Sequence, residues 1–319
     1  TIVTREGYYN LATGKAEFGQ RPVVIDGTRR YTANRITSDD STGIVQLIGN
    51  AVVNDSAQGT TIIAGLILQD RRNEKTLATN KPLMIIRQDK DSIYITADTL
   101  FSARLTDLYG KKDSLVKDTV TGTKVVNVNK KDSTNRYLEG YRNVRIFSDS
   151  LQAIGDSLFY SFKDSVFRLY QDPIVWSKES QITGDTLLLY TKNKKAHRVE
   201  AFENSFLVNQ LEPGVYNQVK ADRMDGWFRE GNIDSVRSKG NAGCIYYIQD
   251  EDSAYTGINE SYSEIMDIYF RDKELHKVVF RNRVNGTIWP IRHKDPALMR
   301  LPGFRWLDNR RPKTKYELF

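Results

Sequence analysis

The sequence contains one cysteine, Cys244, among 319 residues, so no disulfide bond can form within the chain. This excludes a small disulfide-stabilised scaffold but does not exclude an exported protein. The longest apolar run, Ile62 to Leu68, is interrupted by Ala64-Gly65 and is far shorter than the roughly 20 residues that a transmembrane helix needs. The chain begins at Thr1 without Met or a basic and apolar leader, which favours a processed or trimmed product.

Residues that usually carry chemistry are scarce. The three histidines, His197, His276 and His293, are too few and too scattered for a metal site. His197 and His276 stand beside basic residues at equivalent repeat positions, which favours exposed turns. A nucleophile elbow, a phosphate loop and a zinc helix motif are all missing. We therefore predict a protein that is not an enzyme, with no catalytic residue, no metal and no cofactor.

Aspartate recurs in one short pattern, which is Asp, then Ser or Thr, then Leu, Ile or Val. Asp and Ser side chains bond to their own backbone in tight turns, so the pattern is typical of a turn that enters a strand. A calcium site would need clustered oxygen ligands in a glycine-aspartate loop, which is absent. Paired glycosidase carboxylates at Asp156 and Asp185 are disfavoured because both belong to the same turn pattern. The pattern occurs at Asp91, Asp98, Asp113, Asp118, Asp149, Asp156, Asp164, Asp185 and Asp234.

Charge of neither sign dominates. Lys and Arg total 47 against 40 Asp and Glu, which gives a net charge of +7. The charges are interspersed and fit solvated strand faces. Basic residues next to aromatic residues, at Arg142 to Phe147 and Phe280 to Arg283, fit a core equally well, so we predict no nucleic-acid partner.

Short runs rich in β-branched and aromatic residues are abundant. The stretch from Phe167 to Val208 contains several such runs, separated by Asp172-Pro173, Gly184-Asp185 and the basic segment Lys192 to Lys195. Runs of this length with turn residues between them indicate successive antiparallel strands. The sequence therefore predicts an all-β fold with little helix.

A pattern of turn residues followed by an apolar run recurs around Val199, Val236 and Val278, which are 37 and 42 residues apart. Each copy is followed by another apolar run, at Phe206 to Val208, Cys244 to Ile248 and Thr287 to Trp289. We interpret each copy as a hairpin, with the second run as its partner strand. Repeated units of this kind bury their apolar faces by stacking on their neighbours.

Composition divides the chain into four segments. Residues 1–105 and 141–289 read as two halves built from hairpins, and residues 106–140 read as an inserted polar loop or hairpin. Residues 290–319 carry four of the eight prolines. Since proline cannot donate to a sheet ladder, we expect an extended tail, held to the body by Phe304 and Trp306.

Several of these runs resemble the OstA-like family, which includes the LptA-type periplasmic proteins of lipopolysaccharide transport. The resemblance lies in Asp149 to Leu158, Asp172-Pro173, Gln181 to Leu187 and Val199 to Val208, with a weaker copy at Gly49 to Val53, Lys81 to Met84 and Ile95 to Leu100. It implies an open antiparallel β-jellyroll or β-taco with an apolar interior. Two stacked halves are one form that such a fold can take. The chain differs from the LptA-type pattern in its greater length, its insert and its proline-rich tail.

The resemblance also implies a function in outer-membrane biogenesis. The protein would be a periplasmic lipid-binding protein that shields the acyl chains of lipopolysaccharide or a related glycolipid in an apolar groove. Its other partners would be outer-membrane transport proteins bound by strand addition, or further copies of itself bound end to end. Basic residues would meet phosphates at the groove mouth, namely Arg142, Arg145, Lys192, Lys194 and Lys195.

Side chains two positions apart share one face of a strand. On this rule the candidates for lining a lipid groove are Ile93, Ile95, Val144, Ile146, Phe167, Leu169, Leu187, Leu189, Phe206, Val208, Ile245, Tyr247, Ile268 and Phe270. The alternative is an exported structural or adhesive β-repeat protein, whose core is filled by interlocking side chains. A continuous apolar channel open to solvent would distinguish the first reading from the second.

Overall fold

The fold is all-β and antiparallel, as the sequence predicts. The computed structural model describes residues 1–87, 92–109, 135–192, 195–230, 232–250, 252, 254–271, 274–293, 295 and 298–318. Strands take 69% of these residues and helices 5%. Most of the predicted insert, residues 110–134, lies outside the described residues, as do Asp91, Asp113, Asp118 and Lys194.

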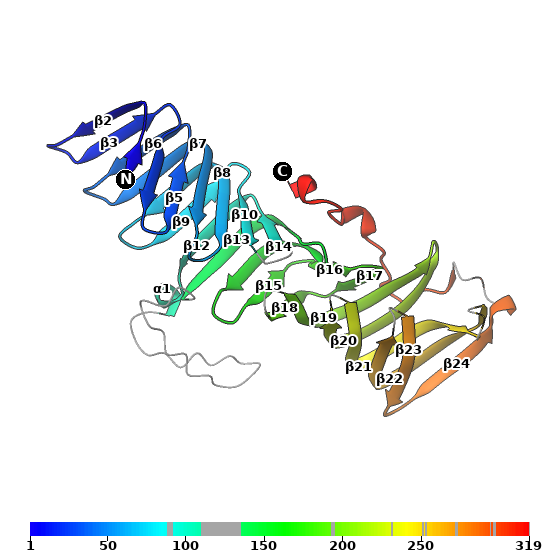
Figure 1. Cartoon of the computed structure of the whole chain (residues 1–319). Helices are drawn as coiled ribbons and strands as arrows, with labels where there is room; N and C mark the ends of the chain where they lie inside the picture. Colours follow the sequence, from blue (N-terminus) through cyan, green and yellow to red (C-terminus); the bar gives the residue numbers. More distant parts are fainter. Residues whose placement is uncertain are drawn as a thin grey trace. The chain divides into compact units, whose positions relative to one another are not determined.

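The chain divides into two compact units (Figure 1). The first unit comprises Thr1–Ile146, Ser157–Val166 and Thr314–Phe319, and the second comprises Phe147–Asp156 and Phe167–Lys313. Each unit contains two antiparallel sheets that share their long strands.

In the first unit, three long strands take part in both sheets: β7 (Ile44–Asp55), β8 (Thr60–Asp70) and β13 (Arg136–Phe147). Short strands complete the first sheet: β1 (Ile2–Val3), β4 (Val23–Asp26), β5 (Arg29–Thr32), β10 (Leu83–Arg87) and β11 (Ser92–Thr96). Others complete the second: β2 (Glu6–Asn10), β3 (Lys15–Gly19), β6 (Arg35–Asp39), β9 (Lys75–Thr79) and β12 (Thr99–Arg104). Two helical elements accompany them, α1 (Leu105–Tyr109) and the 3-10 helix η4 (Lys315–Leu318).

In the second unit, four long strands take part in both sheets: β19 (Lys195–Glu212), β20 (Val215–Arg229), β21 (Asn232–Gln249) and β22 (Tyr255–Arg271). The first sheet adds residues 152–156 of β14 (Gln152–Ser161), then β16 (Ile174–Ser177), β17 (Ser180–Thr183) and β24 (Asn285–Pro290). The second sheet adds β15 (Val166–Tyr170), β18 (Thr186–Lys192) and β23 (Glu274–Arg281). Two short 3-10 helices follow, η1 (Ile291–His293) and η3 (Asp308–Arg310).

Four of the long strands, β7, β13, β19 and β21, change sheet at corners where two consecutive residues have positive φ. In β19 the corner is Glu203-Asn204, and in β21 it is Gly240-Asn241. At the first corner the pairing of β19 with β20 shifts register between Phe202 and Ser205, as expected for a bulge that bends a strand. Further pairs with positive φ are Gln20-Arg21, Gly49-Asn50, Asn80-Lys81, Arg142-Asn143, Gln171-Asp172 and Asn282-Arg283.

These corners correct the predicted hairpins. Val199 and the run Phe206 to Val208, predicted as two paired strands, both lie in β19, and Val236 and the run Cys244 to Ile248 both lie in β21. The residues between them bend one strand instead of reversing the chain. The predicted hairpins were wrong because Gly and Asn favour positive φ in a corner as well as in a hairpin turn.

Two of the recurrent aspartates stabilise these corners. Asn143 donates to both carboxylate oxygens of Asp98, at 3.2 and 3.0 Å, and Asn204 donates to those of Asp185 at 3.2 and 3.1 Å. Each bond joins a corner residue with positive φ to an aspartate that directly precedes a strand, β12 or β18. The aspartates accept here from asparagine side chains 45 and 19 residues away, whereas the turn pattern predicts bonds to their own backbone.

Close packing at the corners makes Gly65 of β8 a sensitive position. A Cβ atom there would lie 2.7 Å from Cβ and 3.1 Å from the backbone oxygen of Asn80, whose φ is +60°. We expect Gly65→Ala to lower the free energy of unfolding by about 1–3 kcal/mol, because neither atom can move independently of the backbone.

Gly19→Ala is the matched control, since the nearest atom to its added Cβ is a flexible Glu6 oxygen at 3.4 Å. Urea denaturation of both variants measures the difference. Equal stabilities would show that the corner tolerates a side chain.

Candidate functional site

The predicted lining residues of the first unit lie on one face of its first sheet. Ile93 and Ile95 of β11 and Val144 and Ile146 of β13 are all buried. Their neighbours in sequence lie on the opposite face, where η4 covers the sheet. There the Lys315 ammonium lies 5.6 Å from the centre of the Tyr94 ring, and Arg145 donates to the backbone oxygen of Glu317 at 3.2 Å.

The second unit buries the predicted residues of β15 and β18 almost completely. Phe167, Leu169, Leu187 and Leu189 are all at most 3% exposed. Leu187 pairs with Ala201 and Leu189 with Val199, which continue the apolar face onto β19.

A cavity of about 20 Å³ lies between the two sheets of the second unit. This volume accommodates about one water molecule and no acyl chain. The Oδ1 atom of Asn209, which also lines the cavity, has no hydrogen-bond partner among the described residues. The apolar lining includes Leu207, Val219 and Cys244 from one sheet and the predicted residues Ile268 and Phe270, with Val278, from the other.

Four predicted lining residues project from the other side of the first sheet. Phe206 and Val208 of β19 flank Leu207, and Ile245 and Tyr247 of β21 alternate with Cys244 and Tyr246, so their side chains point away from the space between the sheets. They form a buried cluster with Ile258, Met299 and Leu301. The strands alternate as expected, but these side chains contact the C-terminal strap, which we define as residues 291–313.

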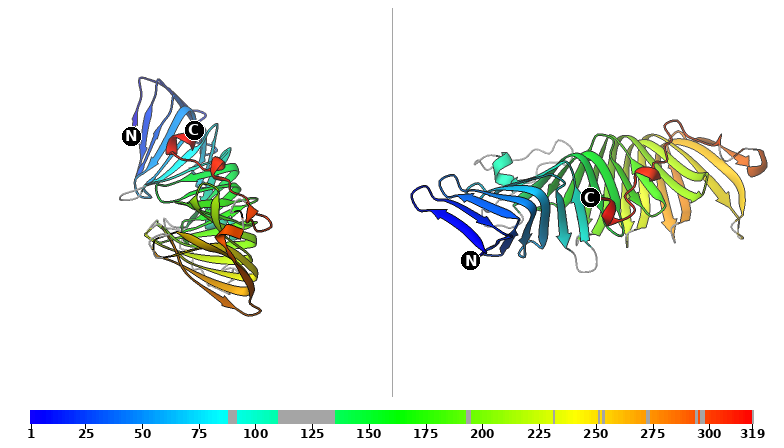
Figure 2. Two further views of the ribbon diagram at one scale, coloured as in Figure 1. Left: turned by 90° about the vertical axis from the view of Figure 1, so that its right-hand side faces the viewer. Right: turned by 90° about the horizontal axis from the view of Figure 1, so that it is seen from above.

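Two buried glutamines bind the backbone of the strap. Gln218 donates to the oxygen of Met299 at 2.8 Å and accepts from the nitrogen of Leu301 at 2.9 Å. Gln181 donates to the oxygen of Arg305 and accepts from the nitrogen of Leu307, both at 2.8 Å. Gln218 and Gln181 are 0% and 1% exposed. Each amide thus satisfies one carbonyl and one N–H group of the strap, as a neighbouring strand would. Figure 2 shows the strap in orange and red.

Aromatic and charged side chains complete the attachment. Phe304 and Trp306 pack beside Tyr216, with ring centres 5.2 and 5.5 Å from its ring, and both contact the buried cluster. Asp172 forms ion pairs with Arg305 at 3.2 Å and Arg310 at 2.8 Å. The prediction that Phe304 and Trp306 hold an extended tail to the body is confirmed.

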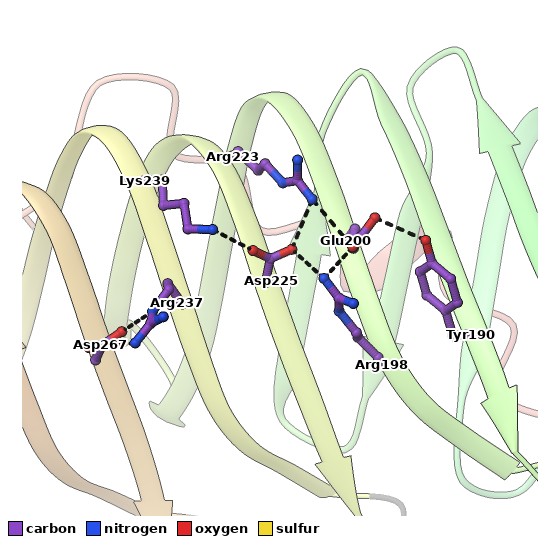
Figure 3. A network of polar contacts seen from close by, with 8 residues as sticks. All are labelled: Tyr190, Arg198, Glu200, Arg223, Asp225, Arg237, Lys239 and Asp267. Atoms are coloured by element: carbon purple, nitrogen blue, oxygen red, sulfur yellow. Dashed lines mark hydrogen bonds and ion pairs between the residues drawn. The ribbon is translucent and has the colours of Figure 1, made fainter. Parts of the chain in front are cut away.

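The second sheet carries a network of ionised side chains on the side opposite its apolar face (Figure 3). Glu200, Asp225, Arg237 and Asp267 occur opposite one another on β19, β20, β21 and β22. We call this surface the charged face. It comprises Arg198, Glu200, Arg223, Asp225, Arg237, Lys239, Asp267 and Arg281.

Arginines relieve the repulsion between the adjacent carboxylates of Glu200 and Asp225. Like charges opposite one another destabilise a sheet, but Arg198 and Arg223 each form ion pairs with both. Lys239 adds a contact of 3.3 Å to Asp225. Asp267 is held separately by Arg237 at 2.5 Å and Arg281 at 3.1 Å.

These partners keep the carboxylates of Asp225 and Asp267 ionised. Burial opposes ionisation of Asp225, but the hydrogen bond from Arg198 and the charges of Arg223 and Lys239 outweigh it and lower its pKa. The hydrogen bond from Arg237 is the main cause of the lowered pKa of Asp267, against an opposing effect of burial. Burial and the charge of Glu200 raise the pKa of Tyr190 to about 12.

Neither the glutamine contacts nor the charged face was predicted from the sequence. Alternation predicts which residues share a face, and it could have placed Arg198, Glu200 and Phe202 together. It could not show that Glu200 is covered by arginines from neighbouring strands. Of the basic residues predicted at a groove mouth, Arg142 lies at the corner of β13, and Lys192 at the end of β18 pairs with Lys195 at the start of β19.

The described residues contain no group of three or more His, Cys, Asp or Glu side chains placed to hold a metal ion. Burial raises the pKa of the Cys244 thiol to about 12. In the described part of the chain, no helix is both long and apolar enough to cross a membrane.

The first strands of the first unit expose apolar side chains. Ile2 on β1 is 50% exposed and pairs with Val24, and Tyr9 on β2 is 49% exposed and pairs with the buried Ala16. Val24 in turn pairs with the buried Tyr31. Because paired residues share a face, Ile2 and Tyr9 continue the apolar faces of the two sheets to an exposed end.

Comparison with known proteins gives resemblances among solved structures. No protein-family model and no curated protein sequence matches the chain. Among solved structures, the chain resembles LptH of Pseudomonas aeruginosa, the LptA-homologous periplasmic component of its lipopolysaccharide transport device. The match has 14% sequence identity and a TM-score of 0.32, and it covers 45% of this chain and 82% of LptH.

The glutamine contacts predict how the strap responds to mutation. We expect Gln218→Leu to release the strap around Leu301, because the variant leaves a buried carbonyl and N–H group unpaired at about 1–3 kcal/mol each. Hydrogen exchange of the Leu301 amide should accelerate. Gln210→Leu, which removes a half-buried bond to Tyr216, is the control, and equal protection in both variants would contradict the assignment.

The charged face predicts a dependence of stability on pH. The pKa values of Asp225 and Asp267 are lowered on folding. Their contribution to the free energy of unfolding is therefore complete above the pKa of the unfolded chain, about 3.9. It is lost as the pH falls through the pKa values of the folded protein. The stability difference between wild type and Asp267→Asn should therefore shrink from pH 6 towards about pH 2.

Asp234→Asn is the control, because the ion pair of Asp234 is with the exposed Arg229, which is not a residue of the charged face. Chemical denaturation across the pH series measures both differences. A difference for Asp267→Asn that stays constant down to the lowest pH would contradict the pKa assignment.

Proposed function

We propose that this protein binds a lipid without catalysing a reaction and shields its acyl chains between the two sheets of the first unit. The observation that carries the proposal is the exposed end of that unit. Ile2 and Tyr9 continue two buried apolar faces to solvent there, and the half-buried Val24 and Phe18 lie next to them.

The energetics support binding of a partial chain. Each buried methylene contributes about 0.8 kcal/mol, so about six methylenes contribute about 5 kcal/mol. The apolar residues behind the opening include Ile36 and Leu47 of the second sheet, both at most 2% exposed.

The cargo that we favour is lipopolysaccharide or a related glycolipid, in the periplasm. The support is the resemblance of the strand and corner motifs to the OstA-like family. Partners in outer-membrane assembly, or a second copy, would bind by strand addition. In the described residues β1 pairs only with β4 and β2 only with β3, so each has an edge that can accept a strand.

A second candidate is a structural or adhesive β-protein with a filled core. The second unit favours it, because its cavity of about 20 Å³ is too small for an acyl chain and its interior residues Leu169 and Leu187 are fully buried. The two candidates therefore differ in what lies between the first strands of the first unit.

Adjacent tyrosines on opposite faces of β2 offer a matched test. A photo-reactive phenylalanine analogue would replace Tyr9, on the apolar face, or Tyr8, on the other face, in the producing cell. Both positions are exposed, at 49% and 62%. We expect glycolipid adducts at Tyr9 and none at Tyr8, as measured by mass spectrometry after irradiation.

A third variant carries the analogue at Leu189, which lies inside the second unit. Lipid at Leu189 as well would extend the site to that unit. A folded protein without lipid adducts at Tyr9 or Leu189 would overturn lipid binding and leave the filled-core candidate.

A further inference from the structure

The charged face presents positive charge to solvent although its carboxylates are paired. It contains five cationic side chains and three carboxylates. The side chains of Glu200, Asp225 and Asp267 are 2–4% exposed, whereas those of Arg237, Lys239 and Arg281 are 45–53% exposed. A ligand that approaches this surface therefore meets hydrogen-bond donors and an excess of two positive charges.

The buried carboxylates hold these cations in fixed positions. Arg237 and Arg281 both bind Asp267, and Arg281 does so with Nε at 3.2 Å and an Nη atom at 3.1 Å. A guanidinium group has five N–H donors, so a carboxylate on one side leaves donors for a second anion. Side chains that are already ordered lose little entropy when a ligand binds.

The spacing of the cations suits a ligand with several anionic groups. Arg237 and Lys239 are two residues apart on β21, and Arg281 lies on β23, with β22 between the two strands. Arg237 and Arg281 both donate to the Oδ2 atom of Asp267 at 3.1 Å, so their guanidinium groups lie close together over β22. Lys239, 3.3 Å from Asp225, is a second cationic centre on the neighbouring carboxylate.

Aromatic rings border the same surface. The Arg198 guanidinium lies 5.5 Å from the centre of the Tyr190 ring and 5.6 Å from that of the Trp227 ring. The Arg223 guanidinium lies 4.6 Å from the centre of the Phe202 ring. Arginines thus partly cover these rings. Tyr269, which is two residues after Asp267 on β22 and so shares its face, is 39% exposed. One open ring beside fixed cations offers an apolar surface for a sugar ring but no series of rings on which successive bases could stack.

We propose that the charged face binds an anionic saccharide, with its carboxylate or phosphate groups on Arg237, Lys239 and Arg281 and a sugar ring on Tyr269. This site lies on the opposite side of the second sheet from the apolar interior. It does not depend on lipid binding in the first unit.

Calorimetry with the full chain and a hexamer of galacturonic acid tests the proposal, because each sugar of this probe carries one carboxylate. The test variant is Lys239→Gln with Arg281→Gln. Asp225 keeps Arg198 and Arg223 in this variant and Asp267 keeps Arg237, so both carboxylates stay paired. Losing two charge-assisted hydrogen bonds should weaken binding by at least about tenfold.

The matched control is Arg229→Gln with Arg283→Gln, which removes two positive charges from exposed arginines of the same unit outside the charged face. Its affinity should equal that of the wild type. Tyr269→Ala should also weaken binding of the hexamer but leave binding of a glutamate hexapeptide unchanged, because only the saccharide has a ring to place on Tyr269.

Three results would overturn the proposal. The first is no binding of the galacturonate hexamer, or equal affinity of the test and control variants. The second is binding of neutral maltohexaose as tight as that of the charged hexamer. The third is tighter binding of a single-stranded hexanucleotide or of the glutamate hexapeptide, which would assign the surface to a nucleic acid or an acidic protein segment.

Discussion

The fold depends on a backbone constraint, which is the pair of positive φ angles at the corners of β7, β13, β19 and β21. A long strand such as β19 pairs with β17 beyond Glu203-Asn204 and with β18 before it, so one strand joins two sheets. The left-handed conformation costs energy for residues with a side chain. Hydrogen bonds such as that from Asn204 to Asp185 offset part of this cost. The two apolar faces can enclose a common interior because the strands bend there.

The two sheets of the second unit differ in the chemistry of their outer sides. The first sheet carries apolar residues on its outer side too, such as Phe206 and Ile245, so it needs the strap as a cover. Gln181 and Gln218 allow that cover to be a non-strand segment, because their amides satisfy its backbone groups. The second sheet carries carboxylates and arginines instead, and their mutual pairing makes burial of Glu200 and Asp225 tolerable.

These arrangements separate the regions available for ligands. The apolar interior of the second unit is closely packed, with a cavity for about one water molecule. Exposed apolar residues concentrate instead in the first strands of the first unit, where Ile2, Tyr9 and Leu11 are exposed. Ordered positive charge is a property of the charged face. Lipid shielding and recognition of an anionic saccharide would therefore use different surfaces.

The sequence by itself determined the all-β class and which side chains share a face of each strand, because turn residues and alternation are local properties. For Val144 and Ile146, which flank Arg145, the apolar residues point to one side only, and the assignment to the interior follows. On β19 and β21 both sides are apolar, since Phe206 and Leu207 are adjacent and so are Cys244 and Ile245. Only the tertiary structure decided which side of these strands faces the other sheet and which side faces the strap. It also decided that Gly240-Asn241 is a corner and not a hairpin turn, because both accept positive φ and the difference lies in the strands that pair on either side.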